Sequence, residues 1–337
     1  MIASVALRVK TVSPGETIFT RNATEAINLV AYSWGSANVG AGDLIVITEM
    51  EHHSNLVPWQ LLAERTGAEL AFAPIDDEGL LIDSALDALL ARGPKLVAFT
   101  HVSNVLGTIN PVADIAARAH AAGAVVLVDG AQAAPHLPLD VRSLGADFYA
   151  WTAHKAYGPT GLGVLHGRRE LLEAMPPFLG GGHMIAKVEK EGSRWAEPPV
   201  KFEAGTSPIA EAVGLGAAVD YLERFGMPAV WEHSRDVVGY AVDRLRDVDG
   251  LEIHGPSELA RRGSVISFAL DGIHPHDVAE ILGREGVCVR AGHHCAQVLM
   301  GRLGVAATTR ASFAVHSTHD DVERLVAGLG TVQEIFA

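Results

Sequence analysis

The sequence has few cysteines: Cys288 and Cys295 are the only two in 337 residues. Two cysteines cannot form a disulfide framework, so we expect a reducing, cytoplasmic environment. Long hydrophobic runs are also missing, because no apolar stretch reaches the roughly 18 residues that span a bilayer. The start, MIASVALRVK, has no basic region ahead of its apolar residues, unlike a signal peptide. The sequence therefore predicts neither a membrane span nor a secretory leader.

Positive charge is scarce as well. Lys and Arg number 26 against 40 Asp and Glu, which gives a formal net charge of -14. Nucleic acids and anionic membranes bind proteins through basic surfaces, so this balance disfavours both as main partners. Apolar residues make up 48% and charged residues 20%, as in a soluble globular protein. The length is sufficient for a large core and two domains.

Short apolar runs alternate with amphipathic stretches through the first half of the chain. The expected strands cover residues 44–48, 68–75, 95–103, 124–130, 147–153 and 161–167, and the expected helices cover 55–66, 82–91, 111–122 and roughly 137–144. The strands are almost continuously apolar, which is typical of strands covered on both faces. The pattern predicts βαβ units and a mostly parallel sheet, with a different connection near residues 150 and 161, where no helix intervenes.

After about residue 235 the pattern changes to shorter strands, such as 264–270, mixed with helices. We therefore expect a large α/β domain over residues 1–235 and a smaller α+β domain over 236–337. Open α/β sheets carry their chemistry at the carboxyl ends of the strands. The polar residues that follow the expected strands are His52, Asn104, Asp129, Gln132, Thr152, His154 and Lys155.

Lys155 and Asp129 follow two different buried strands. Charged groups are rarely buried alone, because removing them from water is costly. One interpretation is a structural ion pair. The other is a site for pyridoxal phosphate (PLP), in which the lysine amine forms a Schiff base with the cofactor and the aspartate pairs with its protonated pyridine nitrogen.

A PLP site also needs a place for the phosphate. Asn22 precedes an amphipathic helix and Glu25 lies three residues later, a variant of the capping box. The backbone N–H groups of Ala23 and Thr24 would then be free at the helix N-terminus, where phosphate binds readily. Most helices have a cap and no phosphate, so this signal is weak alone. Two donors just before the lysine would add to the site: Thr152 and His154.

Two histidine and cysteine motifs leave alternatives open. His52 and His53 are adjacent, so only one can line the site, and for either one a surface or core position fits equally well. In VRAGHHCAQ (289–297), Cys295 is either a metal ligand, for which no CxxC or HxxxH partner is present, or a nucleophilic thiol. Arg290 and the neighbouring histidines would lower the pKa of that thiol. Cys288, in the apolar run GVCVR, is expected to be a packed core cysteine.

Eight segments together resemble the group II (Suf-type) cysteine desulfurases, a family that also includes selenocysteine lyases and belongs to the class V aminotransferase superfamily. They are FTRNATEAINLVA, EHHSNLVPWQ, THVSNVLGTINPV, VDGAQ, AHKAYGPTGLGVL, FEAGT, VRAGHHC and TRASFAVHST. The resemblance runs from about Val12 to the C-terminus. It implies fold type I of the PLP-dependent transferases, with a large mostly parallel-sheet domain, a smaller α+β C-terminal domain and PLP as cofactor.

The resemblance also implies roles for individual residues. Lys155 matches the Schiff-base lysine, Asp129 the partner of the pyridine nitrogen and Gln132 the contact of the phenolic oxygen. His52 matches the histidine that stacks on the ring and relays protons. The phosphate contacts are matched by Thr24, Thr152 and His154, and by Thr206 from the other subunit of a homodimer. Arg310 matches the clamp on the substrate carboxylate, helped by Asn104, and Arg290 lines the same pocket. Cys295 matches the cysteine that carries the persulfide.

The implied activity converts L-cysteine to L-alanine and leaves the sulfur on Cys295, for iron–sulfur cluster assembly through a SufU-like zinc-containing scaffold or a SufE-like activator. A selenocysteine lyase, another class V enzyme such as an epimerase, and a truncated inactive scaffold are the alternatives. The last arises because the family has several tens of residues before the region that matches Met1, so an N-terminal segment is expected to be missing. A smaller departure is His183, where an acidic residue is common.

Overall fold

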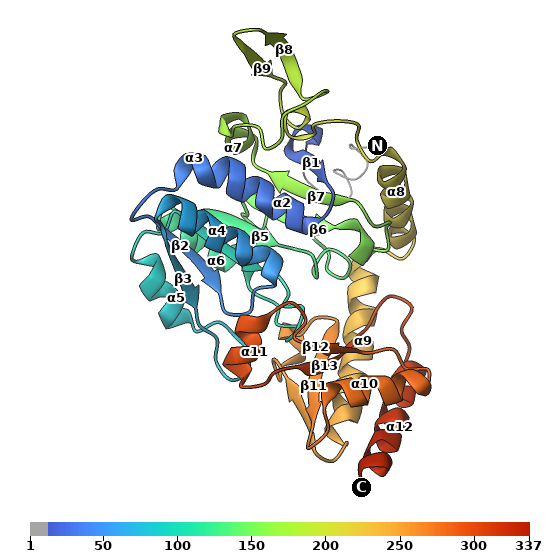
Figure 1. Ribbon diagram of the computed structural model, residues 1–337. Helices are drawn as coiled ribbons and strands as arrows, with labels where there is room; N and C mark the ends of the chain where they lie inside the picture. Colours follow the sequence, from blue (N-terminus) through green and yellow to red (C-terminus); the bar gives the residue numbers. More distant parts are fainter. Residues whose placement is uncertain (1–12) are drawn as a thin grey trace.

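The computed structural model describes residues 13–337; the MIASVALRVK segment lies outside the described residues. The large domain contains a seven-stranded sheet of order β1-β7-β6-β5-β4-β2-β3 (Figure 1). Its strands are β1 (Thr17–Thr20), β2 (Leu44–Thr48), β3 (Glu69–Ala73), β4 (Leu96–Thr100), β5 (Val125–Asp129), β6 (Phe148–Thr152) and β7 (Gly163–Gly167). β2 to β6 pair in parallel, whereas β7 runs antiparallel to β6 and β1. The expected mostly parallel sheet is confirmed, including its changed connection after β6.

Helices cover both faces of this sheet, because alternate strand residues point to opposite sides. Val97 and Phe99 pack in one apolar layer, and Leu96 and Ala98 pack in the other. The first layer is completed by α5 (Asp83–Leu90), α6 (Val112–Ala121) and α8 (Ile209–Glu223). The second is completed by α2 (Ala23–Val30), α4 (Val57–Thr66) and α7 (Arg169–Ala174), with the short α3 (Ser36–Asn38) after α2. Burial on both faces explains the unbroken apolar runs in the sequence.

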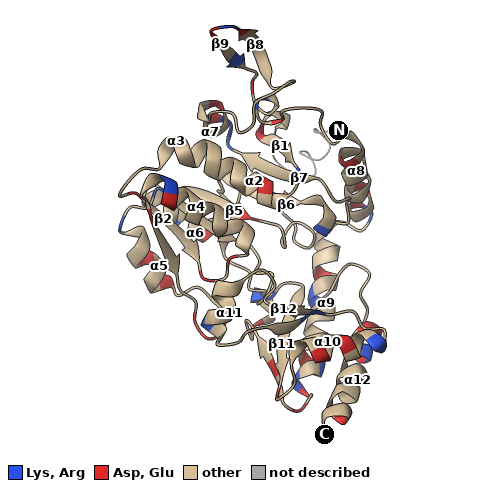
Figure 2. Ribbon diagram, in the orientation of Figure 1, with Lys and Arg blue, Asp and Glu red and all other residues tan. Residues whose placement is uncertain are grey.

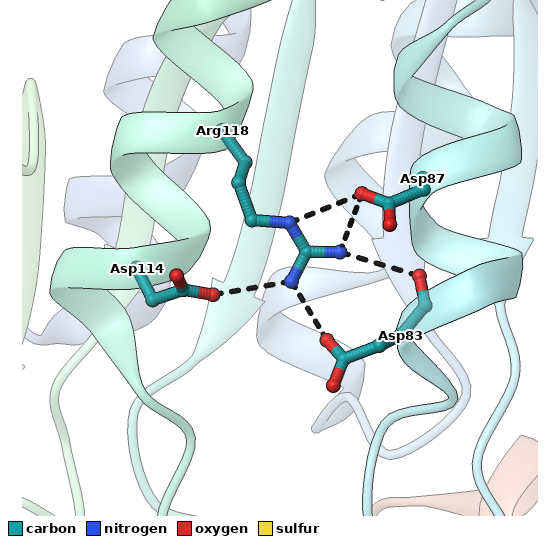
Figure 3. Close-up of polar contacts among 4 residues, drawn as sticks. All are labelled: Asp83, Asp87, Asp114 and Arg118. Carbon is teal, nitrogen blue, oxygen red and sulfur yellow. Dashed lines mark hydrogen bonds and ion pairs between the residues drawn. The ribbon is translucent and has the colours of Figure 1, made fainter.

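One ion-pair network joins α5 to α6 on the outside of the first layer (Figure 3). Arg118 of α6 lies 2.7 Å from Asp83 and 2.7 Å from Asp87 of α5, and 3.1 Å from Asp114 of its own helix. The Arg118 side chain is only 23% exposed. The guanidinium thus fixes the two helices through three carboxylates.

The expected helix at residues 137–144 is wrong. Residues 131–136 and 141–145 form turns instead. Pro138 cannot donate a helical hydrogen bond, and the Asp140 carboxylate accepts the N–H groups of Arg142 and Ser143, as it does in a turn. The sequence also gave no indication of β1 at the sheet edge or of the exposed hairpin β8 (Ile185–Glu189) and β9 (Gly192–Trp195).

The small domain is an antiparallel sheet of order β10-β11-β13-β12 with helices packed on it. The strands are β10 (Leu251–His254), β11 (Val265–Leu270), β12 (Arg290–Gly292) and β13 (Thr308–Ser312), and the helices that share its core are α9 (Met227–Arg246), α10 (Pro275–Arg284) and α12 (His319–Phe336). The expected α+β character is present. The expected boundary at residues 235/236 falls inside α9, and it remains a prediction.

The two domains are joined along a seam at the carboxyl edge of the large sheet. Loop 103–109 bonds to the small domain at three places: Ser267 Oγ to the Val105 carbonyl (2.7 Å), the Gly263 N–H to the Gly107 carbonyl (2.7 Å) and the Ile109 N–H to the Arg261 carbonyl (2.9 Å). Beside it, α11 (Gln297–Leu303) buries Leu299 and Met300 against Met50 and Leu106. Polar residues at this edge are therefore held from both sides.

The described residues agree with the acidic net charge of the sequence and with its lack of long apolar runs. Figure 2 shows acidic residues on the outer helices α5, α8 and α10. None of the described helices is both long enough and apolar enough to cross a membrane.

Candidate active site

A cavity of about 240 Å³ lies where the carboxyl ends of the large-domain strands meet the small domain. Most of the residues singled out in the sequence line it: Ala23, Thr24, His52, Asn104, Asp129, Gln132, Thr152, His154, Lys155, Arg290 and Arg310. Three separate parts of the chain form its walls. They are the N-terminus of α2, the carboxyl ends of β4, β5 and β6, and the small-domain strands β12 and β13. The structure thus brings distant segments into one site.

The N-terminus of α2 forms one end of the cavity. The Asn22 side chain accepts the N–H of Glu25 (2.9 Å), so the cap is present. The N–H groups of Ala23 and Thr24 have no intrahelical partner, as expected at a helix start. The Glu25 carboxylate accepts the N–H of Arg21 (2.5 Å), so the return bond of a capping box goes one residue further back. This end of the cavity suits an anion.

The approach of β7 to this helix end requires a glycine. A Cβ at Gly163 would lie 2.4 Å from the carbonyl carbon of Asn22. Thr152 at the end of the neighbouring strand β6 and His154 in the turn after it add polar groups, with Thr152 Oγ1 2.9 Å from His154 Nδ1. Backbone and side-chain donors therefore converge on the same end of the cavity.

Asp129 lies buried at the end of β5, and it lines the cavity. One carboxylate oxygen accepts the N–H of Ala131 (2.9 Å), and the nearby Ser54 hydroxyl lies 2.8 Å from His52 Nδ1. Burial raises the pKa of Asp129, while the positive charge of Lys155 opposes that shift and the Ser54 hydroxyl also lowers the pKa of the carboxyl group. Ser54 was not identified from the sequence, although it is two residues after His52 in the same motif.

Lys155 ends a short 3₁₀ turn, Ala153–Lys155, directly after β6. Its side chain is half-buried in the cavity wall. Burial lowers the pKa of Lys155, and the nearby Arg310 and Arg290 lower it further against the opposing charge of Asp129. A lysine with a lowered pKa presents its neutral amine more often, as a nucleophile or base requires.

Of the two adjacent histidines, only His52 lines the cavity. Its Nδ1 accepts the N–H of Ser54 (3.0 Å), so the neutral ring carries its hydrogen on Nε2. Burial and the charge of Lys155 lower the pKa of His52 to about 4, so the ring is neutral at pH 7. The ring of His53 instead accepts the N–H of Gln297 (3.1 Å).

Arg310 of β13 forms the small-domain wall. Its Nη1 donates to the main-chain oxygen of Asn104 (2.8 Å), and the Asn104 side chain donates to the main-chain oxygen of His294 (2.8 Å). Burial and the nearby Arg290 lower the pKa of Arg310 to about 10, so it remains charged at pH 7. Its Nε is buried without a hydrogen-bond partner among the described residues. A buried, unpaired guanidinium N–H is suited to an anionic ligand such as a carboxylate.

Cys295 stands beside the cavity, with its Sγ 3.9 Å from Arg290 Nη2. Cys288 is exposed, so the expectation of a packed core cysteine is wrong. Its neighbours Val287 and Val289 pack against the small-domain core, and alternation along an extended segment turns the residue between them outward. Among residues 13–337, no group of three or more His, Cys, Asp or Glu side chains is arranged so that it could hold a metal ion.

Thr206 and His294 differ in their position relative to the cavity. Thr206 is exposed in a loop that lines a different hollow, with His183, and the single chain does not bring it to the cavity. His294 was not identified from the sequence, but it is buried in the cavity wall, where its Nε2 bonds to the Thr308 carbonyl (3.1 Å) and hydroxyl (3.0 Å). Its position next to Cys295 in the same motif was the available signal.

Comparison with known proteins agrees with this geometry. The family model of the class V aminotransferases matches residues 3–325, and the chain belongs to this family. A probable cysteine desulfurase of Streptomyces coelicolor is 53% identical over 96% of this chain and 78% of its own length.

Solved structures show the same fold. The S-sulfonic acid form of the Escherichia coli cysteine desulfurase CsdA superimposes with a TM-score of 0.95 at 38% identity, over 99% of this chain and 83% of that chain. A C-DES mutant with glycine covalently linked to its PLP cofactor has a TM-score of 0.82 at 25% identity, over 97% and 83% of the two chains. The fold expected from the sequence is therefore confirmed.

Proposed function

We propose that the chain is a PLP-dependent cysteine desulfurase, which takes the sulfur from L-cysteine and releases L-alanine. The observation that carries this proposal is the shared cavity of Lys155, Asp129 and Arg310, with Cys295 at its edge. The family membership and the relatives of that activity support the same conclusion.

The cavity fits PLP because its donor groups match the two ends of the cofactor. The N–H groups of Ala23 and Thr24 at the helix N-terminus would bind the phosphate, and the buried Asp129 carboxylate in the same cavity would be the partner for a protonated ring nitrogen. Lys155 would hold the aldehyde carbon. Further contacts would come from Gln132 to the phenolic oxygen, from His52 to the ring face and from Thr152 and His154 to the phosphate. Bound there, PLP supplies an electron sink that weakens the substrate C–S bond.

Residues of the chain bind the substrate, transfer the proton and accept the sulfur. Arg310, with Asn104, holds the substrate carboxylate, and Arg290 lines the same pocket. The Lys155 amine accepts the proton from the substrate Cα. The Cys295 thiolate attacks the substrate sulfur, so an S–S bond forms as the C–S bond breaks, and the carbon fragment is protonated to alanine. Cys295 then carries a persulfide.

We further propose a homodimer in which Thr206 of one subunit contacts the phosphate in the other. The exposed position of Thr206 supports this arrangement, as does the exposed apolar side of α8 with Ile209 and Val213. The persulfide then serves iron–sulfur cluster assembly through a protein acceptor, SufU-like or SufE-like. Both cysteines are free thiols, which fits the reducing cytoplasm.

The test is a direct assay of the purified chain loaded with PLP. We expect L-alanine to form from L-cysteine and one additional sulfur atom to appear on the intact protein by mass spectrometry. Borohydride reduction should fix the cofactor to Lys155 in the peptide map. Absence of both alanine and added sulfur in fully loaded protein would refute the activity.

A further inference from the structure

The turn that carries Cys295 has an uncommon backbone conformation. His294 and Cys295 have φ values of +51° and +57°, in the left-handed region that residues with a side chain disfavour. Two consecutive residues of this kind persist only where surrounding contacts fix the backbone. The contacts on either side of Cys295 therefore decide where its thiol lies.

Two histidine rings accept the main-chain N–H groups around Cys295. On one side, the Cys295 N–H donates to Nδ1 of His293 (3.1 Å). On the other, the Gln297 N–H donates to Nε2 of His53, also at 3.1 Å. The main chain of His53 donates in turn to the Cys295 carbonyl (2.7 Å). His53 of the large domain is thus hydrogen-bonded to the turn on the other side of the seam, through both its ring and its main chain.

These bonds define the protonation of the two rings. A backbone N–H can only donate, so His293 Nδ1 and His53 Nε2 must be unprotonated acceptors. The groups around His53 are the rings of His52 (6.3 Å between centroids) and His293 (5.7 Å) and, near Cys295, the guanidinium of Arg290. Burial, together with His293, lowers the pKa of His53, which keeps the acceptor available.

We propose that His53 and His293 are positioning residues, a pair of hydrogen-bond acceptors that holds the left-handed turn and so fixes the Cys295 thiol at the edge of the cavity, beside Arg290. The inference rests on the proposed function, because it takes Cys295 as the nucleophile. Neither ring lines the cavity itself. Their loss should therefore affect sulfur transfer more than substrate binding.

The chain allows a matched set of variants. His53→Ala and His293→Ala remove the acceptors. His53→Gln places an oxygen near Nε2, and His293→Asn places one near Nδ1, so these two keep the bonds. The control is His274→Ala, because His274 Nδ1 accepts the N–H of His276 in the same way (3.3 Å) but outside the cysteine turn.

The first readout is amide hydrogen exchange of residues 289–303 in PLP-loaded enzyme without substrate. We expect amide exchange in the alanine variants to be about three to ten times faster than in the parent, because this factor corresponds to the net free energy of one hydrogen bond. His53→Gln and His293→Asn should restore the parental exchange rate. The second readout is kinetic: kcat should fall by a similar factor with KM for L-cysteine little changed. The control should match the parent in both.

Parental exchange in either alanine variant would overturn the proposal, and so would failure of both conservative variants to restore protection. Exchange is measured without turnover. A parent enzyme that releases no alanine would therefore refute the proposed function and leave the exchange result standing on its own.

Discussion

Arg310 of the small domain donates to the main-chain oxygen of Asn104 in the large domain, and Asn104 donates from its side chain to the carbonyl of His294, next to Cys295. One residue therefore connects the proposed carboxylate clamp to the cysteine turn. We therefore expect substrate position and thiol position to depend on the same pair of bonds, each 2.8 Å long.

Arg310→Ala should raise KM for L-cysteine by about tenfold or more, since a hydrogen bond to a charged group contributes about 1.5–3 kcal/mol. Arg310→Lys keeps the charge but loses the planar fork, so we expect an intermediate KM. Steady-state kinetics at saturating PLP provide the measurement. An unchanged KM in the alanine variant would remove Arg310 from substrate binding.

Lys155→Ala should lose the covalent link to the cofactor and the base at Cα, so alanine release should fall by at least about a hundredfold. The anion site at α2 is untouched, so some PLP should remain bound but dialyse away. Absorbance of the protein before and after dialysis checks this. Lys187→Ala, in the exposed hairpin, is the control and should behave as the parent. Near-normal turnover without Lys155 would contradict its assignment.

Cys295→Ala should bind PLP and L-cysteine but release no alanine from L-cysteine, because no thiolate remains to take the sulfur. Selenocysteine can still react, since its C–Se bond is weaker. Cys288→Ala should leave both activities intact, because Cys288 is exposed and separate from the cavity. Alanine per active site and the mapped position of the added sulfur are the measurements. Added sulfur on Cys288 would reverse the assignment.

Glu51 gives a pH dependence to stability. Burial raises the pKa of Glu51 to about 8, with Asp129 adding to the shift and hydrogen bonds from Thr48 and Asn55 opposing it. The folded protein therefore keeps a proton that the unfolded chain releases above its ordinary pKa of about 4.5. This contribution to stability is complete below that pH and is lost as pH rises through about 8.

Glu51→Gln should remove this dependence. Relative to the parent, its free energy of unfolding should gain about 1.4 kcal/mol per pH unit between about pH 5.5 and 7.5. Urea unfolding of PLP-loaded protein at several pH values measures the slope. Glu64→Gln, on the exposed side of α4, is the control and should keep the parental slope. Equal slopes for Glu51→Gln and the parent would show that Glu51 is ionised in the folded protein.

Arg118→Met should lower the free energy of unfolding by about 1–2 kcal/mol, because three carboxylates of α5 and α6 lose their shared cation (Figure 3). High salt should reduce this loss by screening the exposed aspartates. Arg92→Met, which removes a single exposed pair with Glu69, should have a smaller effect. Equal effects of the two substitutions would show that the network adds nothing to a simple surface pair.

The sequence was sufficient for six of the seven strands of the large sheet, all except β1, and for most of the cavity, because both depend on local patterns. Apolar runs identified the strands, and the polar residue after each run identified a wall of the site. Lys155, Asp129 and His52 were found in this way. Their roles came from the resemblance to a family, since neither charge nor spacing separates a PLP site from an ion pair.

The missed features depend on contacts between distant segments. Ser54 and His294 stand inside motifs that the sequence singles out, but only the folded chain shows that their side chains line the same cavity as Asp129 and Arg310. Cys288 was assigned to the core because its neighbours are apolar, although side chains alternate along the extended segment. The helix expected at roughly 137–144 is absent, because Pro138 and the Asp140 side chain favour turns in this part of the chain.

The seam between the domains has a consequence for folding. Loop 103–109 and α11 are each bonded or packed to the opposite domain, so neither domain buries its edge alone. Separating the two would expose Leu106, Leu299 and Met300 and leave main-chain groups of the loop without partners. We therefore expect the chain to unfold as one cooperative unit, and loss of the small domain would also remove the β12 and β13 wall of the large-domain site.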